Sequence, residues 1–279
     1  GIKDIPVLGN LRVGQFKEPL SLEELNSSNS NSTIERANVN RLVPSRSAGI
    51  MAYDNFVDSR VSVATGLFRG ADDSYGNYRG DGYAATARLS GLPYLSEDAS
   101  CLMHLAIGYS YRGDDTATYK LSSDHSLASN WKHEVSDVDN TKVLSLEGAL
   151  KLGPFSLQSE WVEADVDASE GGNLDGYYVQ AGYVLTGESR SYDQTLGAFK
   201  GVSPSSEFME DGGIGAWEAV LRWSNLDFSD LTPNQEIDTW TVGLNWYLNK
   251  NIRVMLNYSN AELNDDNVDV IATRFQLAF

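Results

Sequence analysis

The sequence is poor in cysteine, in long apolar runs and in basic residues. Cys101 is the single cysteine, which excludes an internal disulfide. No apolar run approaches the ~18–20 residues that a membrane-spanning helix needs. Lys and Arg together number 21 against 39 Asp and Glu, a formal net charge of −18, so nucleic acid is not an expected partner. The first residues, GIKDIPVLGN, contain neither Met nor a signal sequence, and we expect the numbering to begin inside a longer chain.

Helical patterns are equally scarce. No segment has apolar residues at 3.6-residue spacing between helix caps, and only PLSLEELNSS (19–28) has room for one helical turn. Apolar and polar residues instead alternate at period 2, as in RFQLAF (274–279) at the end of the chain. The sequence therefore predicts an all-β protein. The twelve predicted strands are 10–17, 47–55, 59–70, 81–92, 101–113, 142–152, 154–164, 174–186, 213–226, 237–249, 251–263 and 268–279.

The connections between these strands fall into two length classes. Some are tight turns, at 56–59, 153–154 and 249–251. The long acidic ones are 18–46, 71–80, 114–141, 165–173 and 227–236. Short turns at one end and long loops at the other are typical of an antiparallel outer-membrane β-barrel. Every tight turn falls at one end of the barrel and every long acidic loop at the other if 187–212 is one long periplasmic connection that contains no spanning strand.

Aromatic residues agree with this interpretation. They lie in the apolar register of their strands, several near strand ends, where amphipathic rings suit the membrane interface. These residues are Trp161, Trp217, Trp223, Trp240, Trp246 and Tyr258. The alternative is a secreted soluble β-sandwich, an adhesin or binding module, which would bury the same residues in its core.

Several stretches resemble the phosphate-selective porin O/P family. They are GNLRVGQFKEPLSLEELNSS, PSRSAGIM, YYVQAGYVLTGESRSYD, GAWEAVLRWSNLDFSD, TVGLNWYLNKNIRVMLNY and the closing RFQLAF. The resemblance implies a sixteen-stranded barrel, usually a homotrimer, in the outer membrane of Gram-negative bacteria. It also implies that 18–46 is the outer loop that folds inward and constricts the pore. Strand 10–17 would then be the fifth, so we expect residues 1–279 to be the C-terminal part of a single barrel domain whose N-terminal strands and signal peptide are missing.

The charge expected inside the barrel is opposite to that of the whole chain. If the apolar residues of each strand face lipid, the residues between them face the lumen. The basic residues assigned to the lumen are Arg12, Arg60, Arg88, Arg112, Lys151, Arg222, Arg253 and Arg274, against Glu147, Glu160 and Glu218. The long outer loops carry most of the acidic excess. We therefore expect a basic lumen beneath an acidic surface.

Segment 18–46 has a charge pattern of its own. Its arginines are Arg36, Arg41 and Arg46, with Lys17 at the strand exit. Guanidinium groups match the oxygens of phosphate or carboxylate, so these residues are candidates for anion binding. The alternative is that they pair with the glutamates of the same segment and hold it in place.

No pattern indicates an enzyme or a cofactor, because neither a nucleophile–base pair nor a Gly-rich phosphate loop occurs. His125 and His133 lie in an acidic loop without the tight spacing of a metal site, and NDDNVD (264–269) lacks the Gly and Glu of a calcium loop. We predict an outer-membrane porin for passive diffusion of small anions such as phosphate or polyphosphate. A general or carbohydrate-accepting porin is the alternative. Besides small anions, the expected partners are outer-membrane lipid, lipopolysaccharide and the barrel-assembly machinery, which would recognise the terminal strand through Phe279.

Overall fold

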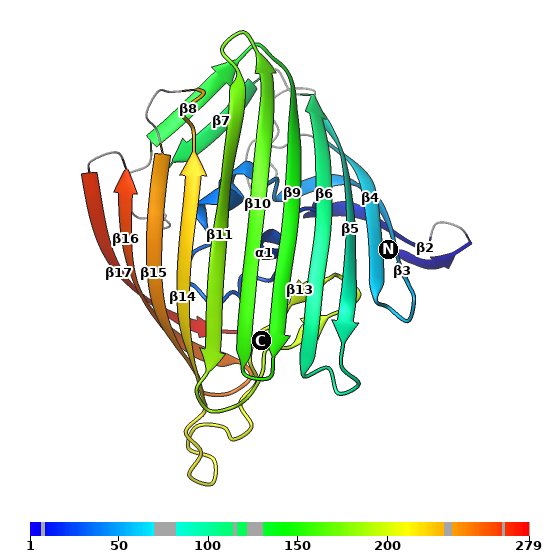
Figure 1. The fold of residues 1–279 in the computed structure, drawn as a ribbon. Helices are drawn as coiled ribbons and strands as arrows, with labels where there is room; N and C mark the ends of the chain where they lie inside the picture. Colours follow the sequence, from blue (N-terminus) through cyan, green and yellow to red (C-terminus); the bar gives the residue numbers. More distant parts are fainter. Residues whose placement is uncertain are drawn as a thin grey trace.

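The computed structural model describes residues 1–6, 9–69, 82–113, 116–121, 131–231, 236–263 and 266–278. Its main feature is one antiparallel sheet of 13 strands in which each strand pairs with the next one in the sheet order (Figure 1). The strands of this sheet are β1 (Ile2–Ile5), β2 (Gly9–Lys17), β3 (Arg46–Phe56), β4 (Val61–Arg69), β5 (Tyr83–Leu95), β6 (Cys101–Gly113), β9 (Val138–Leu152), β10 (Phe155–Ala168), β11 (Gly172–Val184), β14 (Ala216–Asp227), β15 (Glu236–Tyr247), β16 (Ile252–Leu263) and β17 (Asp266–Leu277).

Five smaller elements and one short helix complete the description. The helix α1 (Leu22–Leu25) and the 3-10 helix η1 (Asn38–Leu42) both lie in segment 18–46, which joins β2 to β3. Strands β7 (Thr116–Leu121) and β8 (Trp131–Ser136) form one hairpin, and β12 (Tyr192–Asp193) and β13 (Ala198–Phe199) form another. The helical turn expected within 19–28 is confirmed as α1. Residues 187–212 add no strand to the main sheet, as predicted.

The twelve predicted strands correspond to twelve strands of the sheet, and the all-β class is confirmed. Strand β1 was not predicted, because IKDI is too short to show a convincing alternation. The sheet curls around an interior that contains α1, with β1 and β17 at its two edges, so the barrel is not closed within the described residues (Figure 1). The β-sandwich alternative is wrong, because one continuous curled sheet takes the place of two packed sheets.

Burial in the sheet is inverted relative to a soluble protein. On β9, the inward side chains of Ser145, Glu147 and Lys151 are buried, whereas Leu146 and Leu152 on the other face are exposed. Large apolar side chains cover the convex face of the other strands in the same way. Such an apolar outer belt around a polar interior is the arrangement that a bilayer requires. Within the described residues, no helix has the length and apolar character needed to cross a membrane.

Tryptophans mark the outer face of β14 and β15, as expected for a membrane interface. Trp217 and Trp246 stack with their ring centroids 5.1 Å apart, and Trp223 and Trp240 stack at 5.8 Å. The first pair lies near the short-turn end of these strands, and the second lies closer to the long-loop end. Amphipathic rings at two heights fit the two polar boundaries of the bilayer.

Segment 18–46 lies against the concave face of the sheet. Leu20, Val39 and Leu42 of this segment join an apolar cluster with wall residues such as Val162 and Leu226. The segment therefore has its own core inside the barrel, and its position is fixed by packing as well as by polar contacts.

The connection between β11 and β14 also enters the interior. It begins and ends at the same end of the sheet as the turn between β9 and β10, as expected for 187–212. Its hairpin β12–β13 then turns inward, where Phe199 packs with Leu22, Leu102 and Ala149. Two inserted segments thus meet inside the barrel, and the space between them and the wall is the candidate site.

Candidate functional site

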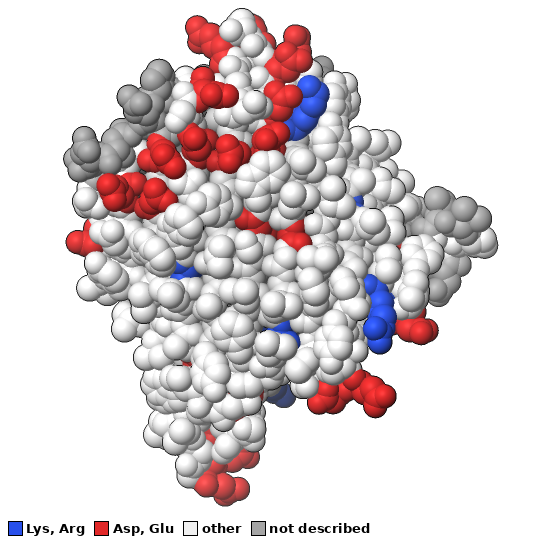
Figure 2. All heavy atoms as spheres, viewed as in Figure 1, with Lys and Arg blue, Asp and Glu red and all other residues white. Residues whose placement is uncertain are grey.

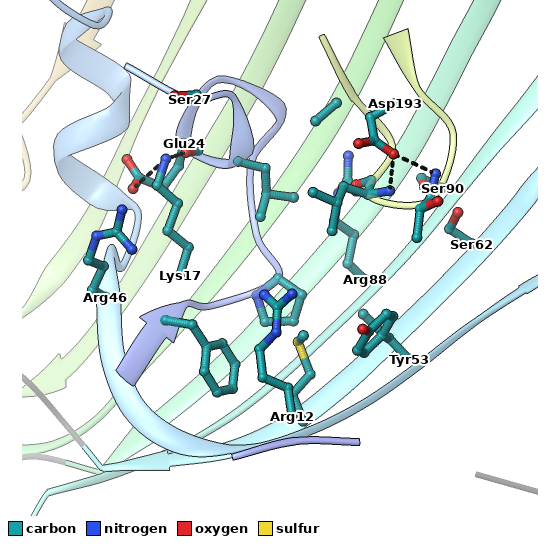
Figure 3. A pocket seen from close by; sticks show the side chains of 18 of the residues that line it. Arg12, Lys17, Glu24, Ser27, Arg46, Tyr53, Ser62, Arg88, Ser90 and Asp193 are labelled. Atoms are coloured by element: carbon teal, nitrogen blue, oxygen red, sulfur yellow. Dashed lines mark hydrogen bonds and ion pairs between the residues drawn. The ribbon is translucent and has the colours of Figure 1, made fainter. Parts of the chain in front are cut away.

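A cavity of 620 Å³ lies between segment 18–46, the β12–β13 hairpin and the wall formed by β2, β3, β4 and β5 (Figure 3). Its charged lining is predominantly basic. The basic residues are Arg12, Lys17, Arg36, Arg46, Arg88 and Lys200, and the acidic residues are Glu24 and Asp193. Serine hydroxyls, among them Ser27, Ser62 and Ser90, lie between these charges. A chain with a large acidic excess therefore encloses a basic interior.

Arg12 is held by aromatic rings. Its guanidinium carbon lies 5.4 Å from the centroid of the Phe16 ring and 5.6 Å from that of Tyr53. This arrangement orients the guanidinium by cation–π contact and leaves its charge uncancelled. No described carboxylate lies within ion-pair distance of Arg12 or of Arg46, whose side chain is exposed at the start of β3. These two arginines are therefore the cavity residues best placed to meet an anion.

Lys17 and Arg36 share one carboxylate. Glu24 lies 3.6 Å from the Lys17 ammonium and 3.3 Å from Arg36 Nε. Lys17 also donates to the backbone carbonyl of Asn26 at 2.9 Å, and Arg36 donates to the same carbonyl at 3.2 Å. Two cations on one carboxylate leave a net positive charge at this corner of the cavity. The expectation that basic residues of segment 18–46 pair with its own glutamates thus describes Arg36. Arg41 donates to Asn38 Oδ1 at 3.2 Å within the same segment.

The positive charge of Arg88 is balanced by a carboxylate of the barrel wall. It lies on β5 and donates to both carboxylate oxygens of Glu147 on β9, at 2.8 and 2.5 Å. It also donates to the backbone carbonyls of Leu196 and Gly197 in the hairpin, at 3.1 and 3.0 Å. Arg88 therefore connects the hairpin to the barrel wall, and bidentate pairing consumes most of its capacity for an external anion.

His104 provides a second connection between the hairpin and the wall. Its Nδ1 lies 2.7 Å from the hydroxyl of Tyr192 on β12, and its Nε2 lies 3.3 Å from Glu147. The side chain of His104 is fully buried between these two groups. The sequence gives no signal for this, because the two partners lie on β12 and β9, far from His104 in the chain.

Lys200 and Asp193 form an ion pair within the hairpin connection, with 2.9 Å between ammonium and carboxylate. Burial acts to raise the pKa of Asp193, but the hydrogen bond and charge of Lys200, with the amides of Thr195 and Leu196, outweigh burial and lower this pKa. Asp193 is therefore ionised at neutral pH and offsets the charge of Lys200. Sequence reasoning missed Lys200, because 187–212 was placed outside the barrel.

Several predicted lumen residues lie beneath segment 18–46 and not beside the cavity. Arg222 donates from β14 to Glu23 Oε1 at 3.2 Å and to Thr33 Oγ1 at 2.7 Å, and Arg253 donates from β16 to the Asn31 carbonyl at 2.7 Å. Both side chains are almost fully buried. These contacts support a role in holding the segment. Their expected role as anion contacts stays a prediction.

Other basic residues also hold the inserted segments. Arg112 on β6 pairs with Glu18 at 3.1 Å at the base of segment 18–46. Lys151 donates to the backbone carbonyl of Arg190 at 3.0 Å, and Arg190 in turn donates to the carbonyl of Ser30 at 3.1 Å. Arg190 was missing from the predicted set for the same reason as Lys200.

The remaining predicted residues are not brought to the cavity. Arg60 ends the turn between β3 and β4 and is exposed there, so it does not line the cavity. Arg274 lies half-buried on β17, near the far edge of the sheet. Phe279, His125 and the 264–265 part of NDDNVD lie outside the described residues, and for His133 only the backbone is described. Among the described residues, no group of three His, Cys, Asp or Glu side chains is arranged to hold a metal ion.

Comparisons with known proteins agree with this architecture. The sequence family described as Phosphate-selective porin O and P matches the chain over residues 6–279. Porin O of Pseudomonas aeruginosa is 28% identical over 320 residues, covering 97% of this chain and 70% of that protein. An uncharacterized protein of Caulobacter vibrioides is 30% identical over 116 residues, covering 40% of this chain and 23% of that protein. The crystal structure of Acinetobacter baumannii OccAB1 has a TM-score of 0.41 and 9% identity, covering 95% of this chain and 74% of that chain, a likeness too low to carry an argument.

Proposed function

Because the chain belongs to the phosphate-selective porin O and P family, we propose that its basic cavity is the anion-selective part of a pore for phosphate and polyphosphate. The protein is an outer-membrane porin of a Gram-negative bacterium, and porins of this family are channels. The observation that carries the proposal is the lining of the cavity, where six basic side chains face two acidic ones.

The balance of ion pairs supports anion rather than cation passage. Arg88 is matched by Glu147, and Lys200 by Asp193. Glu24 then remains as the cavity's other carboxylate, against Lys17 and Arg36, with Arg12 and Arg46 added to the basic side. In a narrow passage with low-dielectric walls, such a local surplus acts on an ion more strongly than charges on the outer surface do. The acidic outer loops are screened over ~8 Å at physiological salt.

Oxyanions are the proposed solutes because of the chemistry of the lining. The Arg12 and Arg46 guanidinium groups present forked donors that match two oxygens of one phosphate. Hydroxyls such as those of Ser27, Ser62 and Ser90 can replace part of the hydration of an anion without holding it tightly. Several shallow contacts in succession suit a pore, because a solute must leave as easily as it enters.

Segment 18–46 is proposed to be the constriction of this pore. Glu18 at its base accepts hydrogen bonds from Ser47 at 2.7 Å and Thr86 at 2.6 Å, in addition to its pair with Arg112. The amides of Leu22 and Glu23 donate to Glu160 at 2.8 and 2.7 Å. These contacts run from the base of the segment to α1, so a rigid segment would hold Lys17 and Arg36 at fixed positions in the passage.

The zero-current potential of the complete porin in a planar bilayer, measured across a KCl gradient, tests the proposal. We expect an anion-selective sign at moderate salt. The double variant Arg12→Gln/Arg46→Gln should reduce the anion-to-cation permeability ratio several-fold, whereas Arg60→Gln, an exposed turn residue outside the cavity, should leave it unchanged. Added phosphate should reduce the chloride current in the wild type and do so less in the double variant.

Two outcomes would reject the proposal. A cation-selective wild-type pore would mean that the cavity does not set the selectivity. An anion-selective pore with equal effects of the double variant and of Arg60→Gln would place the selectivity elsewhere. A pore without preference for either ion would favour the general or carbohydrate-accepting porin.

A further inference from the structure

Two cations of the cavity, Lys17 and Arg36, are held in place from inside the barrel. Figure 2 shows acidic side chains gathered at the upper end of the molecule in this view, whereas these two basic residues line the interior cavity. Their side chains are 16% and 24% exposed, so both are anchored and still reach the cavity. The groups to which they donate therefore decide where these two charges lie.

Most of these groups are backbone carbonyls at the C-terminal end of α1. Arg36 donates from Nε to the Glu23 carbonyl at 3.1 Å. Its Nη2 donates to the carbonyls of Glu24 and Asn26, at 3.4 and 3.2 Å. Lys17 donates to the same two carbonyls, that of Asn26 at 2.9 Å. Carbonyls at the end of a helix lack partners within the helix and favour cations, so the end of α1 holds both charges.

Asn26, the C-cap of α1, also contacts the β12–β13 hairpin. Its backbone amide donates to the Leu22 carbonyl at 3.0 Å, and its side-chain Oδ1 accepts a hydrogen bond from the Phe199 amide at 2.7 Å. Asn26 and Phe199 are each 2% exposed, and the side chain of Phe199 packs with Leu22 of α1. One buried residue therefore binds the hairpin through its side chain and the two cations through its carbonyl.

The two ends of α1 are fixed by different parts of the barrel. At the N-terminal end, Glu160 of β10 accepts hydrogen bonds from the amides of Leu22 and Glu23. At the C-terminal end, Asn26 binds the hairpin, which the wall holds through the donors of Arg88. Loss of the contact between Asn26 and the hairpin would leave the first end docked and release the second, which is the end that holds both cations.

From this arrangement we infer that Asn26 is a positioning residue for anion selectivity. Its side chain fixes the end of α1 against the hairpin and so keeps Lys17 and Arg36 facing the cavity. The side chain of Asn26 does not line the cavity, so it acts on a solute through the two cations and not by contact. The inference rests on the proposed function of the cavity and assigns the contact that tunes it. A displacement of the hairpin is thereby transmitted to both charges.

The zero-current potential of the complete porin in a planar bilayer, measured across a KCl gradient, tests this role in Asn26→Ala. We expect the anion-to-cation permeability ratio to fall several-fold. Proteolysis within the hairpin should be about tenfold faster, because the buried Phe199 amide loses its acceptor. The matched control is Asn29→Ala, since Asn29 belongs to the same segment but is exposed, and it should behave like the wild type in both measurements.

A double-mutant cycle separates positioning from a general structural role. The variant Lys17→Gln/Arg36→Gln lacks both cations and should itself have a lower permeability ratio than the wild type. Adding Asn26→Ala to that variant should not lower the ratio further, because Asn26 acts through the two charges that are already absent. The hairpin should still be cleaved faster in the triple variant, since docking does not depend on those charges.

Three outcomes decide the matter. Equal permeability ratios in Asn26→Ala and the wild type would overturn the role of Asn26, and so would an equal further loss when Asn26→Ala is added to Lys17→Gln/Arg36→Gln. A cation-selective wild type would instead reject the proposed function, so the two failures are distinguishable. If Asn26→Ala does not assemble, Asn26→Ser is measured, because its shorter hydroxyl loses the direct contact but can bind the amide through a water. A wild-type ratio in Asn26→Ser would then overturn the inference.

Discussion

Replacing Arg222 with methionine tests whether buried cations hold segment 18–46 inside the barrel. Arg222 is 1% exposed, and its guanidinium donates to Glu23, Thr33 and the Glu35 carbonyl at 3.2, 2.7 and 3.0 Å. Methionine has a side chain that fills much of the same space but lacks the charge and every donor. The carboxylate of Glu23 loses this guanidinium and keeps its hydrogen bond from the Ala37 amide at 2.9 Å.

The size of the effect follows from the burial of the pair. Removing one partner of a buried ion pair costs about 3–5 kcal/mol, because the other charge stays in a low-dielectric site. With about 1.36 kcal/mol for each factor of ten, the equilibrium between docked and undocked segment shifts by roughly 150- to 5,000-fold. The three hydrogen bonds are not counted in addition, because they belong to the same network.

Single-channel recording of the complete porin is the assay. In Arg222→Met we expect a larger mean conductance and more open-channel noise, because segment 18–46 leaves the wall for part of the time. The double variant Arg222→Met/Glu23→Gln removes both charges and should recover part of the wild-type behaviour. Arg274→Met is the matched control, since Arg274 is only half-buried and no described carboxylate pairs with it.

Limited proteolysis supplies the result that would refute the reasoning. An undocked segment 18–46 is cut faster, so Arg222→Met should be cleaved there before the wild type and before Arg274→Met. Wild-type conductance, noise and cleavage rate in Arg222→Met would show that apolar packing alone holds the segment. If Arg222→Met does not assemble, assembly of the double variant with Glu23→Gln still distinguishes an uncompensated charge from a lost contact.

Three further predictions follow from the hairpin and the terminal strand. Burial acts to raise the pKa of Asp193, but Lys200 and the backbone amides lower it to a greater extent. The Asp193–Lys200 ion pair is therefore fully formed above the ordinary pKa of aspartate, and it is lost as the pH falls through the lowered pKa of Asp193. Anion selectivity should therefore rise in that acidic range, and Asp193→Asn should abolish this rise; the same pH profile in both proteins would contradict it. Tyr192→Phe removes the hydrogen bond to His104 and should weaken docking of the β12–β13 hairpin by about 0.5–1.5 kcal/mol. Proteolysis within the hairpin should then be faster than in the wild type, and an unchanged rate would contradict this prediction. Deleting Phe279 should lower the amount of porin recovered in the outer membrane without changing the amount synthesised. Unaltered assembly would show that Phe279 is not a recognition signal for the barrel-assembly machinery.

The strands were predictable because lipid imposes a simple pattern on them. Each spanning strand exposes every second side chain to hydrocarbon, so Val242 and Leu244 alternate with buried Thr241 and Asn245 on β15. The same pattern fails for β1, which has four residues, and for the hairpin β7–β8, which lies outside the main sheet. Period-2 alternation therefore identifies strands that span the membrane and misses those that do not.

The interior could not be predicted in the same way, because its contacts join residues that are far apart in the sequence. Arg222 meets Glu23 across 199 positions, and Arg253 meets Asn31 across 222. Strand alternation assigns a side chain to the lumen but does not say whether an inserted segment covers it. The inward turn of 187–212 was missed for this reason, and with it Arg190 and Lys200.

Counting inward cations is consequently a poor measure of how strongly a pore attracts anions. Arg88, Arg112 and Arg222 all face inward, yet each is committed to a carboxylate that it can release only at considerable cost. Arg12 rests on aromatic rings, which orient the guanidinium without cancelling its charge. The inward cations of this chain are thus of two kinds, those paired with a carboxylate, such as Arg88, and those that no described carboxylate pairs with, such as Arg12, and only the partners of each cation distinguish them.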